Sequence, residues 1–454
     1  MIKRSAKDKG TDYMFDHDVI VVGCGPAGLM AAGELKRKGF DVGAIDIKVR
    51  LDKVYRAAAG FFCAGQEFNG DYIRCEPRGD TTLLTWTKSG FSYLYPGKIT
   101  PIHKSHLVSN SGSIYTMTAI KKPFMYNFNP STWVKGLYDE ALKLGVSFYP
   151  KTMLLKAWEI PGGMAIETRF EGRRISTMTC RKLVACDGLS SRTAKSLGMN
   201  RNRPLMGRGP TVEYHMDNVE TPFDEGDVGL FGKDNLGMDG YVCMVPASEG
   251  PGSYRIETIV GGGPASKNYI AMEYLINNSR IAHWFKNARV LSRHAATMEL
   301  YPAMKRPYTG NTIFLGDAAA VEESLYAGAT MCGYKGAVAV CKELSDKDGF
   351  KHYTDWWNHK AFEMTNDPQK HAEYIKRFFL HRYLDPEALE RIFELSRENP
   401  LIVDEFNGNP YGFAKTIVNH MLSLPGLKPE WRRNLESMKV ATLQDLRRKR
   451  LQAA

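Results

Sequence analysis

The chain has 454 residues, of which 43% are hydrophobic and 24% charged, a balance that is ordinary for a globular protein and excludes a disordered or fibrous one. A single hydrophobic core usually stops growing below this length, so we expect two or three structural units. No uninterrupted apolar run reaches the length of a membrane span, and the N-terminal segment lacks the apolar core of a secretory signal. We therefore predict a cytoplasmic protein.

The formal net charge is +11, which would attract an acidic electron-donor protein, an anionic substrate or a lipid head group. Nucleic acid is the weaker explanation, and we predict no such partner. Much of the excess charge lies in residues 428–450, KPEWRRNLESMKVATLQDLRRKR, which read as amphipathic helices with basic faces. These faces are either solvated or in peripheral contact with a membrane surface.

The eight cysteines include no C-x-x-C pair and no tight group of four. This spacing argues against structural zinc and against an iron–sulfur cluster, so we predict no metal site. Most of the cysteines are expected to be small, reduced, buried residues.

Residues 18–48, DVIVVGCGPAGLMAAGELKRKGFDVGAIDIK, have the order of strand, glycine-rich turn, helix and strand that is typical of a dinucleotide-binding unit. Gly23 is expected to make the tight turn, Gly25 to let the backbone approach a pyrophosphate, and Gly28 to let the helix pack closely on the strand. Glycine-rich turns also occur where close packing alone demands them. Here every part of the unit follows in order, which favours a nucleotide site.

The helix of this unit is predicted to begin at Pro26, whose missing N–H costs little there, and the free N–H groups from Ala27 onwards can face phosphates. The returning strand, residues 41–47, carries Asp46 at close to the spacing after Gly28 that is expected of a carboxylate binding a ribose hydroxyl. An aspartate at that position argues against NADP, because a 2′-phosphate would meet a negative charge. FAD and NAD remain alternatives at this point.

Beyond this unit the pattern changes several times. Arg56 is either a forked donor to the pyrophosphate or a surface arginine. The three glycines at 261–263 lack the full spacing of a second nucleotide site and are predicted to form a turn, so no separate NAD(P) domain is visible. After about residue 335 we expect helices throughout. The predicted units are a first FAD- or NAD-binding part at 17–70, a β-rich insertion at 71–125, a second nucleotide-binding part at 126–200, an antiparallel-sheet substrate domain at 201–298, a third nucleotide-binding part at 299–345 and a helical C-terminal region at 346–454.

A segment near residue 316, with a glycine followed by an aspartate, bears on the choice between FAD and NAD. In NTIFLGDAAAVEESLYAGATMCGYKGAVAV, a buried strand is followed by Gly316, which permits a sharp turn, and by Asp317. A carboxylate at that position either caps a helix or accepts hydrogen bonds from a sugar-alcohol chain. Together with the N-terminal unit and Asp187 of LVACDGLSSRTAKSLG, it resembles the three-motif set of FAD-dependent monooxygenases and geranylgeranyl reductases.

The resemblance implies FAD as cofactor and an α/β fold, with an FAD-binding Rossmann-type parallel sheet, an antiparallel substrate domain and a helical C-terminal region. By the same resemblance Asp187 and Gly316 belong to the flavin site and Asp317 binds the ribityl chain. Gly328 and Ala329 would approach the isoalloxazine ring. We expect the flavin to be held non-covalently, with Cys332 as the nearest candidate for a covalent link.

Within this superfamily the sequence is more similar to the geranylgeranyl reductases. Asp187, Gly188, Ser191 and Ala194 fit their D-G-x-x-S-x-x-A pattern, and GYVCMVP resembles their G-Y-x-W-x-F-P substrate-cavity motif through Gly240, Tyr241 and Pro246. Ala320 stands where aromatic hydroxylases usually show histidine, and Cys63 falls roughly where the reductases carry a cavity cysteine. The departures from the reductase patterns are Cys243, Val245, Ser324, Ala327 and Ala329.

A reductase of this kind would deliver hydride from flavin N5 to a carbon–carbon double bond in a hydrophobic or lipid substrate, with a proton from a side chain or water. The candidate proton donors are Cys63, Tyr241 and Tyr326, each of which is alternatively a core residue. NAD(P)H or an acidic ferredoxin would supply the electrons. The alternatives are an aromatic hydroxylase that activates oxygen in a water-poor pocket, and an electron carrier to a quinone or partner protein.

Overall fold

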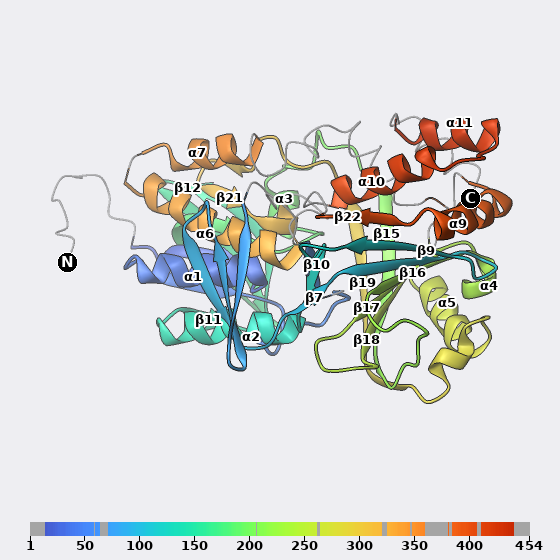
Figure 1. The fold of residues 1–454 in the computed structure, drawn as a ribbon. Helices are drawn as coiled ribbons and strands as arrows, with labels where there is room; N and C mark the ends of the chain where they lie inside the picture. The colour runs from blue at the N-terminus through green and yellow to red at the C-terminus, as the bar shows by residue number, and fades with distance from the viewer. Residues whose placement is uncertain are drawn as a thin grey trace.

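The structure is a computed structural model of the 454-residue chain. It describes residues 14–58, 60–63, 71–205, 207–260, 264–319, 325–345, 347–358, 380, 384–405 and 410–439. Within these ranges the strands form two eight-stranded sheets and two three-stranded sheets. In Figure 1 the sheet that begins with the N-terminal strand lies on the left, and the other large sheet lies on the right.

The first large sheet has a parallel core made of short, buried, β-branched strands, as the sequence predicts. Three helices, α1 (Pro26–Arg37), α2 (Pro130–Lys143) and α6 (Leu325–Glu343), belong to this half, and α1 contacts both of the others. The parallel strands, in spatial order, are β11 (Ser147–Tyr149), β2 (Val42–Ile45), β1 (His17–Val22), β14 (Arg174–Ala185) and β21 (Thr312–Phe314), with β20 (Tyr308–Thr309) paired to β21.

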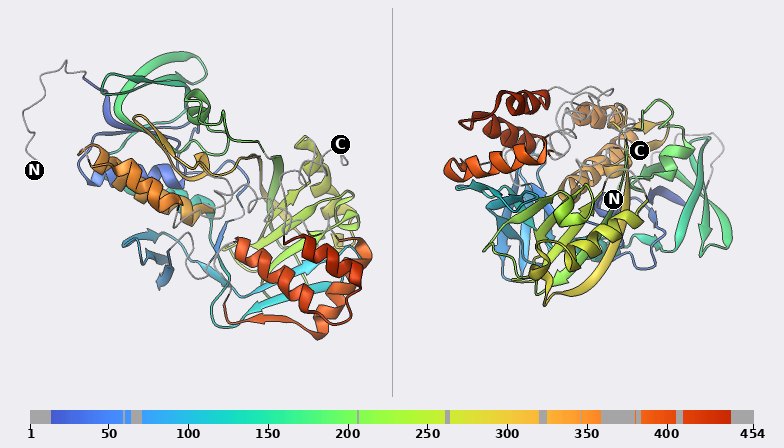
Figure 2. Two further views of the ribbon diagram at one scale, coloured as in Figure 1. Left: turned by 90° about the horizontal axis from the view of Figure 1, so that it is seen from above. Right: turned by 90° about the vertical axis from the view of Figure 1, so that its right-hand side faces the viewer.

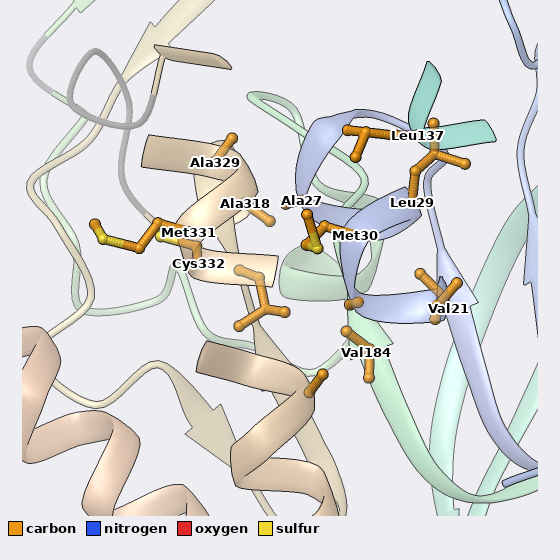
Figure 3. Packing of buried hydrophobic residues seen from close by; sticks show 14 of the residues in the cluster. Val21, Ala27, Leu29, Met30, Leu137, Val184, Ala318, Ala329, Met331 and Cys332 are labelled. Atoms are coloured by element: carbon orange, nitrogen blue, oxygen red, sulfur yellow. The ribbon is translucent and has the colours of Figure 1, made fainter. Parts of the chain in front are cut away.

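Helices α1 and α6 cross closely because their contact is built from small residues. A side chain at Gly333 of α6 would overlap the carbonyl oxygen of Ala27. Ala27, Ala318 and Ala329 lie at this junction in Figure 3, with Met30 packed beside them. The close contact holds the glycine turn before α1 near the segment before α6. The first and third sequence motifs therefore lie side by side.

An antiparallel extension continues the first sheet. The strands β12 (Thr152–Ile160) and β13 (Gly163–Phe170) form a meander with the first half of β14, while the second half of β14 joins the parallel core. The short helix α3 (Arg192–Ser196) packs on β12.

The second large sheet is mostly antiparallel. Alternation along its strands places apolar side chains on one face, against α5 (Ser266–Asn277) and the 3-10 helix η1 (Ala282–Phe285). The other face is polar on β15 and β18 beside the first sheet and apolar on β8 and β9, where the C-terminal helices cover it. The predicted fold class is confirmed. In spatial order the strands are β19 (Arg289–Leu300), β15 (Gly207–Asp217), β18 (Tyr254–Ile259), β17 (Tyr241–Pro246), β16 (Asp227–Phe231), β8 (Lys104–Val108), β9 (Ile114–Ala119) and β22 (Leu401–Val403), with α4 (Lys233–Leu236) after β16.

Residues 71–125 are divided among three sheets. A small meander packs on the first half through stacked rings, with Trp86 and Phe91 centroids 4.5 Å apart and Phe91 and Tyr334 centroids 4.2 Å apart. Strands β8 and β9 join the second large sheet. The domain boundaries expected from the sequence remain a prediction. The meander is β4 (Ile73–Arg78), β5 (Thr81–Trp86) and β6 (Phe91–Tyr95), and the other small sheet is β3 (Phe61–Cys63), β10 (Met125–Asn127) and β7 (Thr100–Ile102).

The C-terminal region is helical apart from one strand. Figure 2 shows its last helices lying along the end of the second sheet, where Tyr115 of β9 meets Phe393 at 5.6 Å between ring centroids. The expectation of helices throughout was wrong at β22, because Pro400 ends the preceding helix and the apolar run after it pairs with β9. The helices are α7 (Gly349–Trp356), α9 (Pro386–Glu398), α10 (Pro410–Ser423) and α11 (Pro429–Ser437).

Among the residues that the structure describes, no helix combines the length and the apolar character that crossing a membrane requires.

Candidate flavin site

The glycine turn after β1 separates packing glycines from an open one. Gly23 has a φ of 98°, and a side chain there would overlap the carbonyl oxygen of Cys186. A side chain at Gly28 would overlap the carbonyl oxygen of Gly23. A Cβ at Gly25, in contrast, would meet no atom within 4 Å. The first and third glycines therefore serve packing, and the second faces free space of the kind that a pyrophosphate needs.

Asp46 lies at the end of β2 beside this turn. Its carboxylate accepts hydrogen bonds from the backbone N–H of Cys24 at 2.6 Å and from that of Lys48 at 2.8 Å. The Lys48 ammonium group donates to the Cys24 carbonyl oxygen at 2.7 Å, a contact that sequence reasoning missed. A carboxylate has about four acceptor positions, so two remain for a ribose. The ribose role of Asp46 stays a prediction that this geometry allows.

The third motif is tied to the loop after the first unit. Arg56 donates to the Asp317 carboxylate at 3.0 Å. The arginine that the sequence left open as a pyrophosphate donor or a surface residue therefore pairs with the predicted ribityl ligand. Gly316 has a φ of 59°, and a Cβ there would lie 3.3 Å from the Ala27 Cβ atom. The acid motif is thus packed against the start of α1.

Asp187 has a different position from the one predicted for a cofactor ligand. One carboxylate oxygen accepts from the Ser191 hydroxyl at 2.6 Å, and the other accepts from the Thr193 N–H at 2.9 Å and hydroxyl at 3.0 Å. Burial raises the pKa of Asp187, and these donors oppose that rise. Its neighbours Gly188 and Leu189 line the cavity, whereas Asp187 itself does not. The structure favours a role for Asp187 in shaping the loop.

All three motifs converge on one cavity of about 180 Å³. It lies between the nucleotide-binding half and the polar face of the second sheet, and most of its lining is apolar. Of the predicted α6 residues, Ala329 lines it and Gly328 does not. The lining residues fall into the first motif with Gly25, Pro26 and Ala27, the following loop with Arg56, Ala57, Ala58, Gly60 and Phe61, the second motif with Cys186, Gly188 and Leu189, the third motif and α6 with Leu315, Asp317, Leu325, Tyr326 and Ala329, and the second sheet with Thr211, Glu257 and Ala296.

The second sheet contributes acidic groups that the sequence analysis did not single out. Glu257 lines the cavity, and Glu213 lies directly opposite it on the neighbouring strand. Burial, followed by the charge of Glu257, raises the pKa of Glu213 to about 8, although Arg255 acts in the opposite direction. The sequence did hold a signal for these two glutamates, the alternation of side chains along a strand. In TVEYHM and RIETI each glutamate stands between residues that point to the opposite face of the sheet.

The two tyrosines among the predicted proton donors are not brought together. Tyr326 lines the cavity, with its ring centroid 5.1 Å from that of Phe128. Tyr241 is outside the lining and packs on Phe231, 5.2 Å between centroids, in the cluster beneath the C-terminal helices. Cys63 lies in β3 opposite Met125, and its side chain is outside what the structure describes. Ala320 and Ser324 are also outside the described residues, as are residues 261–263.

Comparison with known proteins agrees with this arrangement. Residues 16–59 match the family described as FAD binding domain. The digeranylgeranylglycerophospholipid reductase of Methanocaldococcus jannaschii is 24% identical over 80% of this chain and 87% of its own. Digeranylgeranylglycerophospholipid reductase 2 of Methanosphaera stadtmanae is 24% identical over 84% of this chain and 91% of its own. The predicted resemblance to the FAD-dependent geranylgeranyl reductases is confirmed. The protein is an FAD-dependent oxidoreductase.

Solved structures confirm the fold shared by these reductases and the monooxygenases. A geranylgeranyl bacteriochlorophyll reductase-like protein from Thermoplasma acidophilum superposes with a TM-score of 0.67 at 16% identity, covering 93% of this chain and 99% of that one. The p-nitrophenol 4-monooxygenase of Pseudomonas putida gives a TM-score of 0.54 at 12% identity, covering 96% of both chains. Because both classes share the fold, the choice of reaction depends on the site.

Proposed function

We propose that the protein reduces a carbon–carbon double bond in an isoprenoid chain, with FAD as the hydride carrier. The observation that carries the proposal is the cavity in which the three cofactor motifs meet the second sheet. Its largely apolar lining suits a hydrocarbon. The relatives named as reductases of geranylgeranyl lipids, which match over most of their length, support the same reaction class.

The residues around the cavity fit FAD. The free space beside Gly25 and the N–H group of Ala27 at the start of α1 would take the pyrophosphate. Asp46 would hold the ribose and Asp317 the ribityl chain, with Arg56 fixing the Asp317 carboxylate in place. The bound flavin supplies a hydride, which the protein's own groups cannot provide.

Around the hydrocarbon the chain has two tasks, to exclude water and to provide a proton. Leu189, Leu325 and Phe61 give the cavity an apolar wall. Tyr326 is the sequence-predicted donor whose side chain lines the cavity, and burial raises its pKa far above the ordinary value for a tyrosine. Its hydroxyl group therefore stays protonated and is a weak proton donor.

The partners follow from the surface charge. An acidic ferredoxin, or NAD(P)H entering the same cleft, would supply the electrons. Lys428, Arg432 and Arg433 at α11 would favour peripheral contact with an anionic membrane surface, where an isoprenoid lipid is found, while the protein itself remains in the cytoplasm.

The experiment is anaerobic. FAD-loaded protein is reduced with dithionite and mixed with geranylgeranyl lipids, short alkenes or aromatic acids while the flavin absorbance is followed. Return of the oxidised spectrum with the lipids alone supports the proposal. Reoxidation that requires oxygen and an aromatic acid would replace it with the hydroxylase, which the monooxygenase fold neighbour also allows.

A further inference from the structure

Two glutamates face each other across adjacent strands on the cavity side of the second sheet. In the register of β15 and β18, Glu213 is directly opposite Glu257, so both side chains lie on the same face. Glu257 lines the cavity, and Glu213, which is 1% exposed, lies next to it. The row continues with His294 opposite Glu213 and Cys243 opposite Glu257.

The two carboxyl groups have unequal partners. Glu213 accepts a hydrogen bond from the backbone N–H of Ala58 at 2.9 Å, and its other oxygen lies 3.8 Å from the Arg255 guanidinium. Glu257 accepts from the Thr211 hydroxyl at 2.6 Å and makes no ion pair within the described residues. One oxygen of Glu257 therefore remains for a group inside the cavity. Since Ala58 belongs to the loop that lines the flavin side, the pair connects the two walls of the site.

The surroundings do not neutralise both carboxylates. Arg255 is shared with Glu249, at 3.1 Å. His294 faces Glu213, and burial together with the Arg255 charge lowers its pKa, which keeps it neutral near pH 7. Cys243 on β17 and Tyr326 on α6 are themselves protonated groups, because burial raises both pKa values. Two adjacent buried carboxyls with a shared arginine retain a proton, as paired carboxylates do.

We propose that the Glu213–Glu257 pair is the proton donor of this site and that Glu257 delivers the proton to the substrate. This proposal rests on the proposed function. The double bond of the substrate gains a hydride from reduced FAD at one carbon and a proton from the Glu257 carboxyl at the other. The π bond is replaced by two C–H bonds, the flavin is oxidised, and the carboxylate pair regains a proton from solvent.

The pair suits this task better than Tyr326. A general acid works best when its pKa lies near the working pH. Burial and the neighbouring carboxylate bring the pKa of Glu213 to about 8, and burial raises that of Glu257. Tyr326, whose pKa burial raises far higher, would give up its proton only at a large cost.

The test compares Glu257→Gln with Glu273→Gln. Glutamine keeps the size of the side chain and an acceptor for Thr211 but removes the acidic proton. Glu273 is an exposed carboxylate on α5, on the opposite face of the same sheet, bonded to the Tyr214 hydroxyl at 2.9 Å. We expect equal FAD content and equal dithionite reduction in both variants. Reoxidation of the reduced flavin by a geranylgeranyl lipid should slow by about 100-fold or more in Glu257→Gln alone.

Glu213→Gln sharpens the assignment through pH. Without the neighbouring carboxylate, Glu257 loses its proton at lower pH, so the alkaline fall in the reoxidation rate should move to lower pH. A readout that does not depend on turnover is the infrared band of a protonated carboxyl group at pH 7, with and without FAD. Asp227, whose pKa burial raises to about 7, contributes to the same band, so the test is the difference between variants. The band should have equal intensity in the wild type and in Glu273→Gln and lower intensity in the Glu213→Gln, Glu257→Gln double variant.

The outcomes separate the two proposals. Wild-type turnover with an unchanged rate in Glu257→Gln would overturn the donor assignment and leave the reductase function standing. Absence of any alkene-dependent reoxidation in the wild type would overturn the proposed function and the donor with it. An infrared band of unchanged intensity in the double variant would contradict the shared proton whatever the activity.

Discussion

The two walls of the cavity are built in different ways. The nucleotide side comes from short motifs. Gly28 is required by its contact with the carbonyl oxygen of Gly23 five residues earlier, and Gly23 and Gly316 are required by positive φ angles of 98° and 59°. The sheet side comes from Glu213 and Glu257, which meet only because β15 and β18 pair in one register. The backbone of the nucleotide side is therefore determined by the local sequence, whereas the carboxyl pair of the sheet side depends on how two distant strands pair.

This difference matters for how such proteins diverge. The chain shares its fold with both a reductase-like protein and a monooxygenase, and one fold can carry different reactions. The side chains that the second sheet presents can then change without disturbing the cofactor. We infer that the reaction type of this protein is set on β15 and β18.

The largest effect is expected on the local wall. Gly28→Val should abolish FAD binding and lower stability severely, because its Cβ would overlap the carbonyl oxygen of Gly23. Gly25→Ala is the matched variant, since its Cβ meets no protein atom and intrudes only where the pyrophosphate would lie. It should fold with a normal melting temperature and lose FAD affinity. Thermal unfolding and flavin titration distinguish the two, and equal melting temperatures would contradict the packing role of Gly28.

Asp317→Ala should weaken FAD binding by about tenfold to a hundredfold, because charge-assisted hydrogen bonds contribute roughly 1.5–3 kcal/mol. Asp46→Ala should have an effect of similar size at the other end of the cofactor. Flavin fluorescence titration measures both. The control is Arg56→Lys, which keeps a cation near Asp317 and should cost less. Unchanged affinity in a folded Asp317→Ala protein would show that the ribityl site lies elsewhere.

On the sheet wall the expected effect is on the pH dependence of stability. The pKa of Glu213 is raised in the folded protein to about 8, so the folded state binds this proton more tightly than the unfolded state does. Its contribution is fully present below the unfolded pKa of about 4.5 and is lost as the pH rises through about 8. Wild-type protein should therefore lose a few kcal/mol of unfolding free energy across this window, and Glu213→Gln should lose less. Urea titrations of both proteins at pH 6 and pH 9 check this. The same change in unfolding free energy between the two pH values in both proteins would contradict it.

The smallest effect is expected at Asp187, which lies next to the cavity but does not line it. Thr193→Val removes one hydroxyl donor to Asp187 while the Thr193 N–H remains, which should cost about 1 kcal/mol of stability. FAD affinity should change by only a few-fold, because Asp187 does not line the cavity. Thr193→Ser serves as the control that keeps the hydroxyl. A large loss of affinity in Thr193→Val would place Asp187 among the direct ligands after all.

The sequence was sufficient where the constraints are local. The strand and helix of residues 18–48 and the turn at Gly316 follow from side-chain pattern and backbone sterics, and both are present. It was insufficient for β22, whose three residues become a strand only because β9 has an open edge beside it. The same limit hid Glu213 and Glu257, since alternation predicts a strand and a face but not the residue opposite.

The Arg56 contact illustrates a further limit. The sequence shows an arginine near a phosphate motif and an aspartate far along the chain, and nothing local indicates that they pair at 3.0 Å. Tyr241 was selected from a motif, yet packing with Phe231 places it outside the cavity. Positions chosen by motif were reliable for the backbone and less so for the direction of the side chain.

The central claim is that hydrogen from the reduced flavin and the acid pair enters a double bond within this cavity. The most direct measurement is a single anaerobic turnover of stoichiometrically reduced wild-type protein with a geranylgeranyl lipid, followed by mass spectrometry of the lipid. We predict that each reduced flavin adds two hydrogen atoms to one double bond, and that the same experiment in heavy water adds two deuterium atoms, because the N5 hydrogen of the reduced flavin and the carboxyl proton both exchange with solvent. A lipid of unchanged mass, or a product that gains oxygen and forms only in air, would contradict the account.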